Sequence, residues 1–508
     1  MASENTNRIA RNTVMLYFRM ILMMLVNLYT SRVVLNALGV ENFGIYNVVG
    51  GIVVMFSFLQ GATTTATQRF LNYELGTTDG KNLLKVFSSS IEVHIFIGLI
   101  CVCIAESIGL WIVSHKLSIP IESRDASIWV YHFSVFTFFI NMINAPYNAA
   151  IIAHEKMGVY AYIAIVEVIM KLLVACSLVY FLFDKLILYA ALLFIVALII
   201  HIVYLFYCRI CFCECKFKFY WDFTFIKKFF SFSSWMLMGS LASLLSTQGV
   251  NILLNIFFGP LVNAARGVAC QVQAAVNSFA LNFMVAVNPQ IVKSYSQQKL
   301  DYMYHLVFAS SKFSFFLLFI ISIPLLINTD LILTLWLKNV PEYAVLFTRL
   351  ALIDILFQVL NIPIGVISQA SGKVRNYQLI MALFFSLIFV ISYIAFEKGA
   401  PAYSTFLIAI FCTVLGTIGR ILVLKKMIDF PVLIYLKKVV FPVIIIFLFS
   451  LPVLFLSDIY WNIKSSLSAI LFFSLLIVSL FSYLIWKIGL SSSERFFFIQ
   501  KLQQIKNR

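Results

Sequence analysis

Two stretches of the sequence match each other: NAPYNAAIIAHEKMGVY at residues 144–160 and NIPIGVISQASGKVRNY at residues 361–377. Asn, Pro, Lys and Tyr stand at matching places, about 217 residues apart. A second match has almost the same offset, because VFSSS at residues 86–90 is echoed by VFASS at residues 307–311. Two echoes at nearly one offset predict an internal duplication.

The composition indicates the solvent in which this duplicated chain folds. Of its 508 residues 62% are hydrophobic and only 11% are charged, which does not suit one water-soluble core. Runs of roughly 20 apolar residues can cross a hydrocarbon layer of about 30 Å, and about fourteen such runs fill the chain. We predict an all-α polytopic membrane protein with about 14 transmembrane helices, the first of them an uncleaved span.

The repeated phrases lie at the ends of the fourth and tenth expected spans, so the repeat unit is six spans. An even number of spans keeps both copies in one orientation, which predicts two six-helix lobes related by a parallel repeat, with the substrate path between them. The expected segments are residues 1–208 for the N-terminal lobe, 209–229 for a cytoplasmic interfacial linker, 230–424 for the C-terminal lobe, 425–487 for two additional helices and 488–508 for a cytoplasmic amphipathic tail. For the linker and the tail, the alternative to a helix on the membrane surface is a loosely ordered basic loop.

The basic residues predict the orientation of the chain. The net charge is +16, and nucleic-acid binding would be one use for it. However, of the 37 Lys and Arg residues about 24 fall in the termini and even-numbered loops and about 6 in the odd-numbered loops. Both termini are therefore expected in the cytoplasm, where the charge faces the anionic inner leaflet, and no nucleic-acid partner is expected.

Four of the nine cysteines cluster at the cytoplasmic end of the sixth expected span. The spacing of Cys208, Cys211, Cys213 and Cys215 allows a metal site. No histidine accompanies them and they fall at a membrane edge, which favours reduced cysteines without a metal. We expect neither a metal nor a cofactor.

Polar side chains at membrane depth are costly, so the stripes that they form at helical spacing are informative. Each such residue can simply join helices, but stripes at equivalent places of both lobes predict a polar central cavity. The stripes comprise Gln60, Thr64 and Thr67; Thr137, Asn141, Asn144 and Asn148; Ser240, Thr247 and Asn251; Arg266, Gln273, Asn277 and Asn288; and Asp354, Gln358, Asn361 and Gly365. We assign substrate binding to Gln60, Asn141, Asn144, Asn251, Gln273, Asn277 and Gln358.

Arginines within or beside the spans are sharper evidence. An arginine at mid-membrane costs about 2.5 to 3.5 kcal/mol on insertion scales and should meet water, a partner or an anion. Arg19 and Arg32 lie in the first expected span, Arg69 at the mouth of the second, and Arg266 in the eighth. Their guanidinium groups match phosphate oxygens and predict a substrate that carries phosphate or pyrophosphate. Structural pairs with Asp or Glu are the alternative.

Other charged groups have simpler interpretations. Glu167 and Lys171 are spaced i, i+4 and are expected to pair with each other, so neither is counted as a substrate ligand. Asp354 lies on a polar stripe and is a candidate for ion coupling through uptake of a proton, with pairing to an arginine as the alternative.

The loop after the first expected span, LNALGVENFGIYNVV at residues 35–49, supplies Leu38, Gly39, Glu41, Phe43, Gly44 and Tyr46. This pattern resembles the signature of Wzx-type polysaccharide flippases, within the multidrug/oligosaccharidyl-lipid/polysaccharide exporter superfamily. The sequence departs from it at Val40, where that family often has proline. The span count, the linker and the repeat extend the resemblance over the whole chain.

The resemblance implies alternating access that moves an undecaprenyl-pyrophosphate-linked oligosaccharide from the cytoplasmic to the outer leaflet of the bacterial inner membrane. The product would be O-antigen or another surface polysaccharide. Basic residues of the first and eighth spans bind the anionic head group in related flippases, and Arg19 and Arg266 fit those places. The implied partners are the lipid-linked oligosaccharide, membrane lipids and other polysaccharide assembly proteins.

Three rival functions are weaker. A multidrug extruder has the same fold, but cation exporters typically carry an acidic residue in the first span, where this chain has Arg19 and Arg32. A membrane enzyme is not expected, since no Asp-x-Asp motif or nucleophile, His and acid arrangement occurs. A scaffold would leave the membrane arginines as an unexplained cost.

Overall fold

The structure is a computed structural model, and it describes residues 2–77, 82–115, 120–178, 180, 184–220, 222–337, 339–460, 467–492, 494, 495 and 499. These residues form helices and no strand, and 13 of the helices are long and apolar enough to cross a membrane. The predicted all-α polytopic membrane fold is confirmed. By contacts the chain forms two compact units: unit 1 comprises residues 1–240 and 285–299, and unit 2 comprises residues 241–284 and 300–508. The expected lobe boundaries at residues 208, 229 and 424 stay a prediction.

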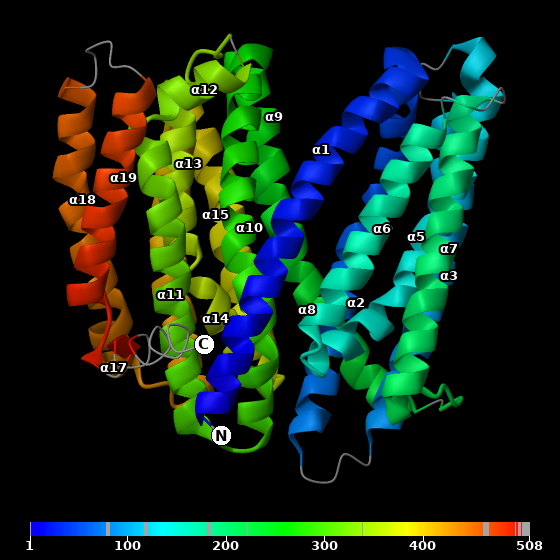
Figure 1. The fold of residues 1–508 in the computed structure, drawn as a ribbon, viewed down its shortest axis with the longest axis horizontal. Coiled ribbons are helices and arrows are strands. Elements are labelled where there is room, and N and C mark those ends of the chain that lie inside the picture. The colour runs from blue at the N-terminus through cyan, green and yellow to red at the C-terminus, as the bar shows by residue number, and fades with distance from the viewer. Residues whose placement is uncertain are drawn as a thin grey trace. The chain divides into compact units, whose positions relative to one another are not determined.

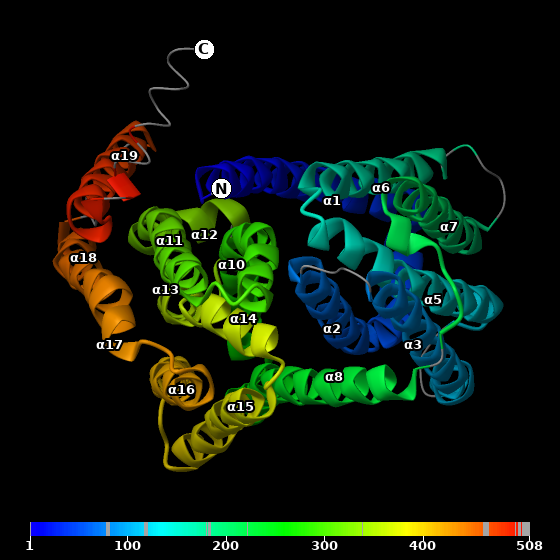
Figure 2. The same ribbon diagram turned by 90° about the horizontal axis from the view of Figure 1, so that it is seen from below.

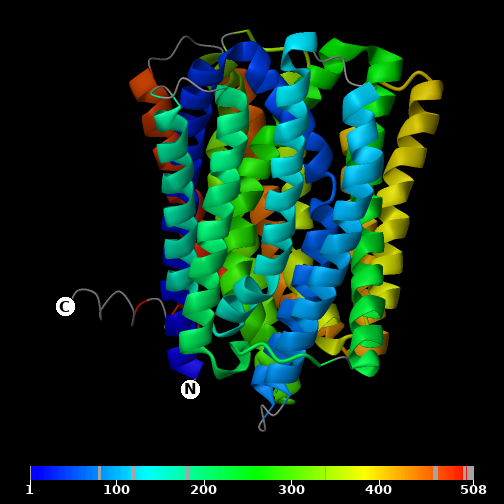
Figure 3. The ribbon, with the colours of Figure 1, turned by 90° about the vertical axis from the view of Figure 1, so that its right-hand side faces the viewer.

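Unit 1 is built around a central helix, α5. This helix contacts α1, α2, α3 and α7, while α1 also contacts α6, and the helices of this unit run side by side (Figures 1 and 3). The bounds are α1 Ala2–Val54, α2 Ser57–Gly76, α3 Leu83–Ile104, α4 Leu110–His115, α5 Arg124–Ala153, α6 Met157–Ser177, α7 Lys185–Cys211 and α8 Phe223–Leu244. Most of α8 and the C-terminal end of α10 belong to this unit.

Unit 2 repeats the packing order of unit 1. Helix α11 contacts α13 and α13 contacts α16, as α3 contacts α5 and α5 contacts α7 in unit 1 (Figure 2). Two later helices, α18 and α19, pack on α11 and match the two expected additional helices. The bounds are α9 Val250–Phe258, α10 Pro260–Ser296, α11 Leu300–Ile327, α12 Thr329–Leu337, α13 Ala344–Gln358, α14 Asn361–Ser371, α15 Arg375–Glu397, α16 Ser404–Ile428, α17 Val432–Tyr435, α18 Phe441–Tyr460 and α19 Leu467–Leu484.

A glycine bends the chain at the same place in both units. Gly39 has φ 79° and ψ 166° within α1, and Gly259 has φ 81° and ψ −179° between α9 and α10. Residues that carry a side chain rarely adopt such positive φ values, so glycine is the residue that fits. Pro260 follows Gly259 where Val40 follows Gly39. The equivalent bends, about 220 residues apart, support the internal duplication.

The second expected span, Phe43–Ala66, is divided in the structure. Helix α1 ends at Val54, a turn follows, and α2 begins at Ser57. The sequence of α2, SFLQGATTTATQRFLNYELG, is too polar for it to count as an apolar span. This division explains why 13 spans are found among the described residues where about 14 were predicted.

The repeated Asn-x-Pro phrase joins equivalent helices in each unit. In unit 1 the Asn144 side-chain oxygen accepts a hydrogen bond from His201 Nδ1 at 2.6 Å, linking α5 to α7. In unit 2 Asn361 Nδ2 donates to Thr417 Oγ1 at 2.8 Å, linking α14 to α16. The first asparagine of the phrase therefore holds the same helix pair together in both units.

The segment between α7 and α8 is fixed to the start of α3. Apart from a 3-10 turn at Cys213–Cys215 it contains no helix among the described residues. The Lys218 backbone N–H donates to Ser88 Oγ at 3.2 Å, and the Tyr220 N–H donates to Glu92 Oε1 at 2.7 Å. The VFSSS echo thus lies where the linker is held. The location of the linker at the membrane surface stays a prediction.

The corresponding part of α11 holds the start of the C-terminal tail. Lys312 Nζ lies 2.6 Å from Glu494 Oε2, and both side chains are largely buried. Glu494 also accepts a hydrogen bond from the Ser491 N–H at 2.7 Å. The predicted amphipathic tail at 488–508 lies mostly outside the described residues.

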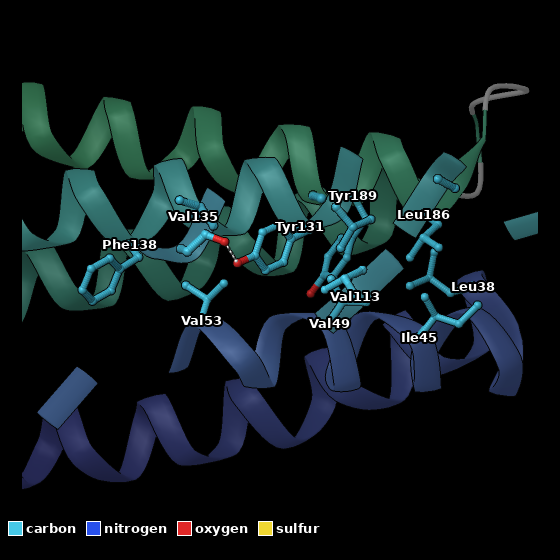
Figure 4. Packing of buried hydrophobic residues seen from close by; sticks show 14 of the residues in the cluster. Leu38, Ile45, Val49, Val53, Val113, Tyr131, Val135, Phe138, Leu186 and Tyr189 are labelled. Atoms are coloured by element: carbon cyan, nitrogen blue, oxygen red, sulfur yellow. Dashed lines mark hydrogen bonds between the residues drawn. The ribbon is translucent and has the colours of Figure 1, made fainter. Parts of the chain in front are cut away.

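A core of apolar side chains packs α1, α5 and α7 together in unit 1 (Figure 4). Val53, Phe138 and Tyr189 belong to this core. Tyr131 is fully buried within it, and its hydroxyl donates to the Ala105 carbonyl at 2.7 Å. The core holds these three helices in a well-packed arrangement.

Candidate functional site

A cavity of about 690 Å³ lies within unit 1. Helices α1, α2, α5, α6 and α7 line it, and α1 contributes residues from both sides of its bend at Gly39. The polar lining residues are Asn27, Thr30, Ser31, Ser57, Gln60, Ser134, Thr137, Asn141, Glu167 and Lys171. The aromatic lining residues are Phe43, Tyr46, Phe138 and Tyr189.

The aromatic wall of this cavity is continuous with the core shown in Figure 4. The rings of Tyr46 and Tyr189 meet edge to face with their centroids 5.0 Å apart. Phe138 contacts Phe56 at 6.0 Å between centroids. These ring contacts restrict the rotamers of the lining residues, so the wall is preorganised to receive a ligand.

Two predicted binding residues, Gln60 and Asn141, meet at the cavity. Gln60 Nε2 donates to the Asn141 backbone carbonyl at 3.0 Å, which joins α2 to α5 and leaves the exposed Asn141 side chain for a ligand. Asn144 does not belong to the described lining, because its side chain is buried and bonded to His201. A substrate role for Asn144 stays a prediction.

An ion pair forms part of the cavity wall. Lys171 Nζ lies 2.5 Å from Glu167 Oε1, which confirms the predicted i, i+4 pair. The two side chains are 40% and 33% exposed, so both remain accessible from the cavity that they line. The sequence interpretation set the pair aside as ligands, whereas the structure places it in the candidate site.

The predicted arginines of unit 1 lie outside the described cavity lining. The Arg19 guanidinium lies 4.3 Å from the ring centre of Tyr160, and that of Arg69 lies 5.0 Å from the ring of Tyr73. Cation–π contacts of this kind stabilise a guanidinium. Arg32 is exposed on α1. Their predicted contacts with substrate stay predictions.

Arg266 is a buried cation of unit 2, with 8% of its surface exposed. Its Nη1 donates to the Thr247 carbonyl at 2.8 Å and to Asn251 Oδ1. The carbonyl lies in a π-helical turn at Leu245–Gly249, a distortion that interrupts regular helical hydrogen bonding. No described carboxylate forms an ion pair with Arg266. The structure thus brings the predicted residues Arg266 and Asn251 into contact, and no described carboxylate neutralises the charge of Arg266.

Asp354 is a buried acid of unit 2 whose partners are neutral. It accepts hydrogen bonds from Gln358 Nε2 at 2.6 Å, Thr413 Oγ1 at 3.1 Å and Gln273 Nε2 at 3.4 Å. No described Arg or Lys pairs with it, in contrast to the alternative considered from the sequence. The predicted residue Asn277 also has a buried side-chain oxygen that makes no hydrogen bond within the described residues.

The family of the chain follows from a family model. The model, described as "Polysaccharide biosynthesis protein", matches residues 9–295, more than half of the chain. The chain belongs to the polysaccharide biosynthesis protein family. The predicted resemblance to polysaccharide exporters is confirmed at this level. Among curated proteins no match is found.

Solved structures similar to this chain include transporters. A MATE protein in the straight conformation superposes with a TM-score of 0.69 at 13% identity, over 83% of this chain and 97% of that chain. An outward-facing multidrug resistance MATE family transporter of the MOP superfamily gives 0.70 at 11% identity, over 84% and 96%. A MOP superfamily transporter from Pyrococcus furiosus, reported for the reverse polarity of its binding pocket, gives 0.67 at 13%, over 83% and 96%. The likeness shows a MATE-like fold.

Several residues that line the cavity were missed by the sequence interpretation. Asn27, Ser31 and Val34 follow one another at helical spacing on α1 and all line the cavity. That stripe was a readable signal. Tyr46 stood out only as part of the family signature, and Tyr189 gave no signal, because aromatic side chains are common throughout this apolar sequence.

The four clustered cysteines differ in their burial. Cys208 and Cys215 are buried, while Cys211 and Cys213 are exposed. A hydrogen bond with Cys208, together with burial, raises the pKa of the Cys215 thiol above its ordinary value. This shift favours the protonated thiol, which is a poor metal ligand. The absence of a metal there stays a prediction.

Proposed function

We propose that the protein is a flippase that moves a polyprenyl-pyrophosphate-linked oligosaccharide to the outer leaflet of the bacterial inner membrane by alternating access. The observation that carries this proposal is Arg266. A buried guanidinium held only by neutral acceptors retains its charge. Leaving that charge uncompensated is costly, and binding of a pyrophosphate would offset the cost. Membership of the polysaccharide biosynthesis family supports this choice of ligand.

The unit 1 cavity supplies the chemistry for the glycan part of such a substrate. Its volume of about 690 Å³ falls within the roughly 300–1,000 Å³ typical of small-molecule sites. The amide groups of Gln60 and Asn141 and the hydroxyl group of Ser134 can both donate to and accept from sugar hydroxyls. The rings of Tyr46 and Tyr189 offer apolar faces for the C–H surfaces of sugars.

Two further parts of the proposal concern orientation and coupling. The bias of basic residues toward the termini and even-numbered loops supports cytoplasmic chain ends and hence entry of the substrate from the cytoplasm. Asp354, buried among neutral donors, would take up a proton in one state of the cycle and so couple transport to an ion gradient. Asp354→Asn would then flip its substrate at a rate that no longer responds to a proton gradient.

The test is flipping of a fluorescent lipid-pyrophosphate-linked oligosaccharide in proteoliposomes, at matched protein amounts. We expect the wild type to flip it and Arg266→Ala to lose about 10- to 100-fold of the rate, which corresponds to one charge-assisted hydrogen bond of roughly 1.5–3 kcal/mol. Arg19→Ala should lower the rate less, and Arg266→Lys should retain part of it because the charge remains.

The same liposomes distinguish the alternative function, a multidrug or other lipid-linked precursor exporter of the same superfamily. Cationic dyes serve as the competing cargo. Transport of dyes together with failure to move the lipid-linked sugar would replace the flippase proposal with the extruder. Equal flipping by wild type and a folded Arg266→Ala variant would remove Arg266 from the site.

A further inference from the structure

Glu155 is a buried acid at the end of unit 1 where α5 turns into α6. Its side chain is 1% exposed, and it is not needed by the cavity or by Arg266. Its carboxylate meets Arg8 Nε at 2.7 Å, Lys293 Nζ at 2.8 Å and Gln290 Nε2 at 2.6 Å. One acid therefore joins the start of α1, the α5–α6 turn and the end of α10.

The backbone at Glu155 is unusual for its residue type. Its φ of 58° is left-handed, a conformation that normally favours glycine. At the equivalent place of the repeated phrase unit 2 has Gly372, with φ 74°. The same turn is therefore made without strain in unit 2, whereas unit 1 makes it at a glutamate whose carboxylate has three side-chain partners.

The end of α10 is packed closely against the rest of unit 1. Leu16, Ile152 and Met157 form a buried apolar cluster with Ala286 of α10. A Cβ added to Gly76, at the end of α2, would lie only 1.7 Å from Ser296 Oγ. The ionic contacts of Glu155 thus secure a segment that also fits tightly through apolar and backbone contacts.

Helix α10 contains a proline near the start of this segment. The division between the two compact units falls between Met284 and Val285, inside α10. Pro289 stands four residues after Val285 and has no N–H to donate to the Val285 carbonyl. A helix that lacks this hydrogen bond bends there more easily. The segment 285–299 can therefore change its direction relative to the earlier part of α10.

We propose that Glu155 is a conformational latch: it holds residues 285–299 of α10 on unit 1 in one state of the transport cycle, and transport requires the latch to open. Opening exchanges the contacts with Gln290 and Lys293 for water, while Arg8, 46% exposed, remains as a partner for the carboxylate. The latch concerns the conformational cycle and does not depend on which substrate the protein carries.

Hydrogen exchange of the full-length protein in lipid nanodiscs tests the latch without any substrate. Glu155→Gln keeps the size of the side chain but removes the charge, and Lys293→Met removes the opposite charge. Both should raise the exchange rate of residues 285–299 several-fold. Asp222→Asn is the matched control, because it removes the Lys85–Asp222 ion pair of unit 1, at 2.8 Å, without touching α10. It should leave residues 285–299 unchanged.

The two variants also separate a latch from a general structural contact. A rise confined to residues 285–299 and the first turns of α1 supports the latch. An unchanged rate in folded Glu155→Gln and Lys293→Met overturns it. A rise spread over α5, α6 and α7 as well overturns it too, because it would indicate that the contact stabilises the whole unit.

A reversible cross-link tests whether opening is needed for transport. Arg8 and Lys293 both contact Glu155, so an Arg8→Cys/Lys293→Cys pair can be joined by a short bis-thiosulfonate reagent and released by reduction. Flipping should stop when the pair is joined and return on reduction, while the two variants that carry only one of the substitutions, treated alike, keep their rate. Unchanged flipping by the cross-linked protein overturns the proposal. If the wild type moves another cargo, that cargo is the readout, and the exchange experiment is unaffected.

Discussion

Tyr46 and Arg266 occupy the same place in the two halves of the duplicated chain. Each follows, seven residues later, a glycine with positive φ: Gly39 in unit 1 and Gly259 in unit 2. Tyr46 meets the ring of Tyr189 and lines a cavity, whereas Arg266 is a buried cation held by a backbone carbonyl. The duplication has therefore kept the backbone of this bend, while the chemistry at its exit has diverged.

Replacing Arg266 with the residue that unit 1 uses is the severest test of this divergence. Arg266→Tyr removes the charge but leaves an aromatic group that the bend accommodates in unit 1. We expect flipping of a pyrophosphate-linked oligosaccharide to fall about 100-fold, with little loss of folded protein. The measurement is the initial flipping rate in proteoliposomes beside the thermal midpoint. A variant that flips normally would show that the two positions are chemically equivalent.

The reciprocal position sharpens the comparison with a smaller expected effect. Tyr46→Ala removes a ring that lines the cavity and packs on Tyr189 at 5.0 Å. An aromatic pair of this kind contributes about 0.5–1.5 kcal/mol beyond its buried area, so the flipping rate should fall about tenfold. Tyr46→Phe keeps the ring and serves as the matched control. A loss in Tyr46→Phe equal to that in Tyr46→Ala would shift the role from the ring to the hydroxyl.

The sequence predicted features that depend on local spacing better than features that depend on tertiary contacts. The Glu167–Lys171 pair could be predicted because i, i+4 neighbours meet on any helix. The partner of Asn144 could not, since His201 lies 57 residues away and polar spacing alone does not separate a helix-joining residue from a ligand. Glu155 was missed for the same reason, because its partners lie 135 or more residues away along the chain, some before it and some after it.

The two glycines offer a thermodynamic test of the shared bend. An alanine Cβ at Gly39 or Gly259 would meet no atom within 4 Å, so the substitution acts through the backbone alone. A non-glycine residue held at positive φ with extended ψ costs about 1–3 kcal/mol, and Gly39→Ala and Gly259→Ala should destabilise the protein by similar amounts. Denaturant unfolding in detergent, compared with Gly44→Ala, measures the effect. A cost at only one glycine would mean that the bends are not equivalent.

The smallest expected effect is on thermal stability, and it concerns the ion pair by which each unit holds the segment that follows it. Lys85 pairs with Asp222 of the linker, and Lys312 pairs with Glu494 of the tail. The hydrogen bond with Lys85 lowers the pKa of Asp222 to about 2, from an ordinary value of about 3.9. Because the folded pKa is depressed, this contribution to stability is present above pH 4 and is lost as the pH falls toward 2.

The corresponding measurement is the thermal midpoint as a function of pH. Asp222→Asn should melt slightly below the wild type at pH 6, and the difference should shrink as the pH approaches 2. The Lys312–Glu494 pair is largely buried, whereas the Lys85–Asp222 pair is partly exposed, so Glu494→Gln should lower the midpoint more. The reverse order would contradict the comparison of the two ends.

The composition of unit 1 has a consequence for biosynthesis. This unit includes residues 285–299, which leave the ribosome only after residues 241–284 of the other unit. A nascent chain released as far as residue 240 still lacks Gln290 and Lys293, so the carboxylate of Glu155 is left with Arg8 alone. Domains often fold in the order in which they are synthesised, but here the first unit is completed by the second half of the gene. A gene split between the two halves would therefore yield an N-terminal fragment in which the carboxylate of Glu155 is incompletely neutralised.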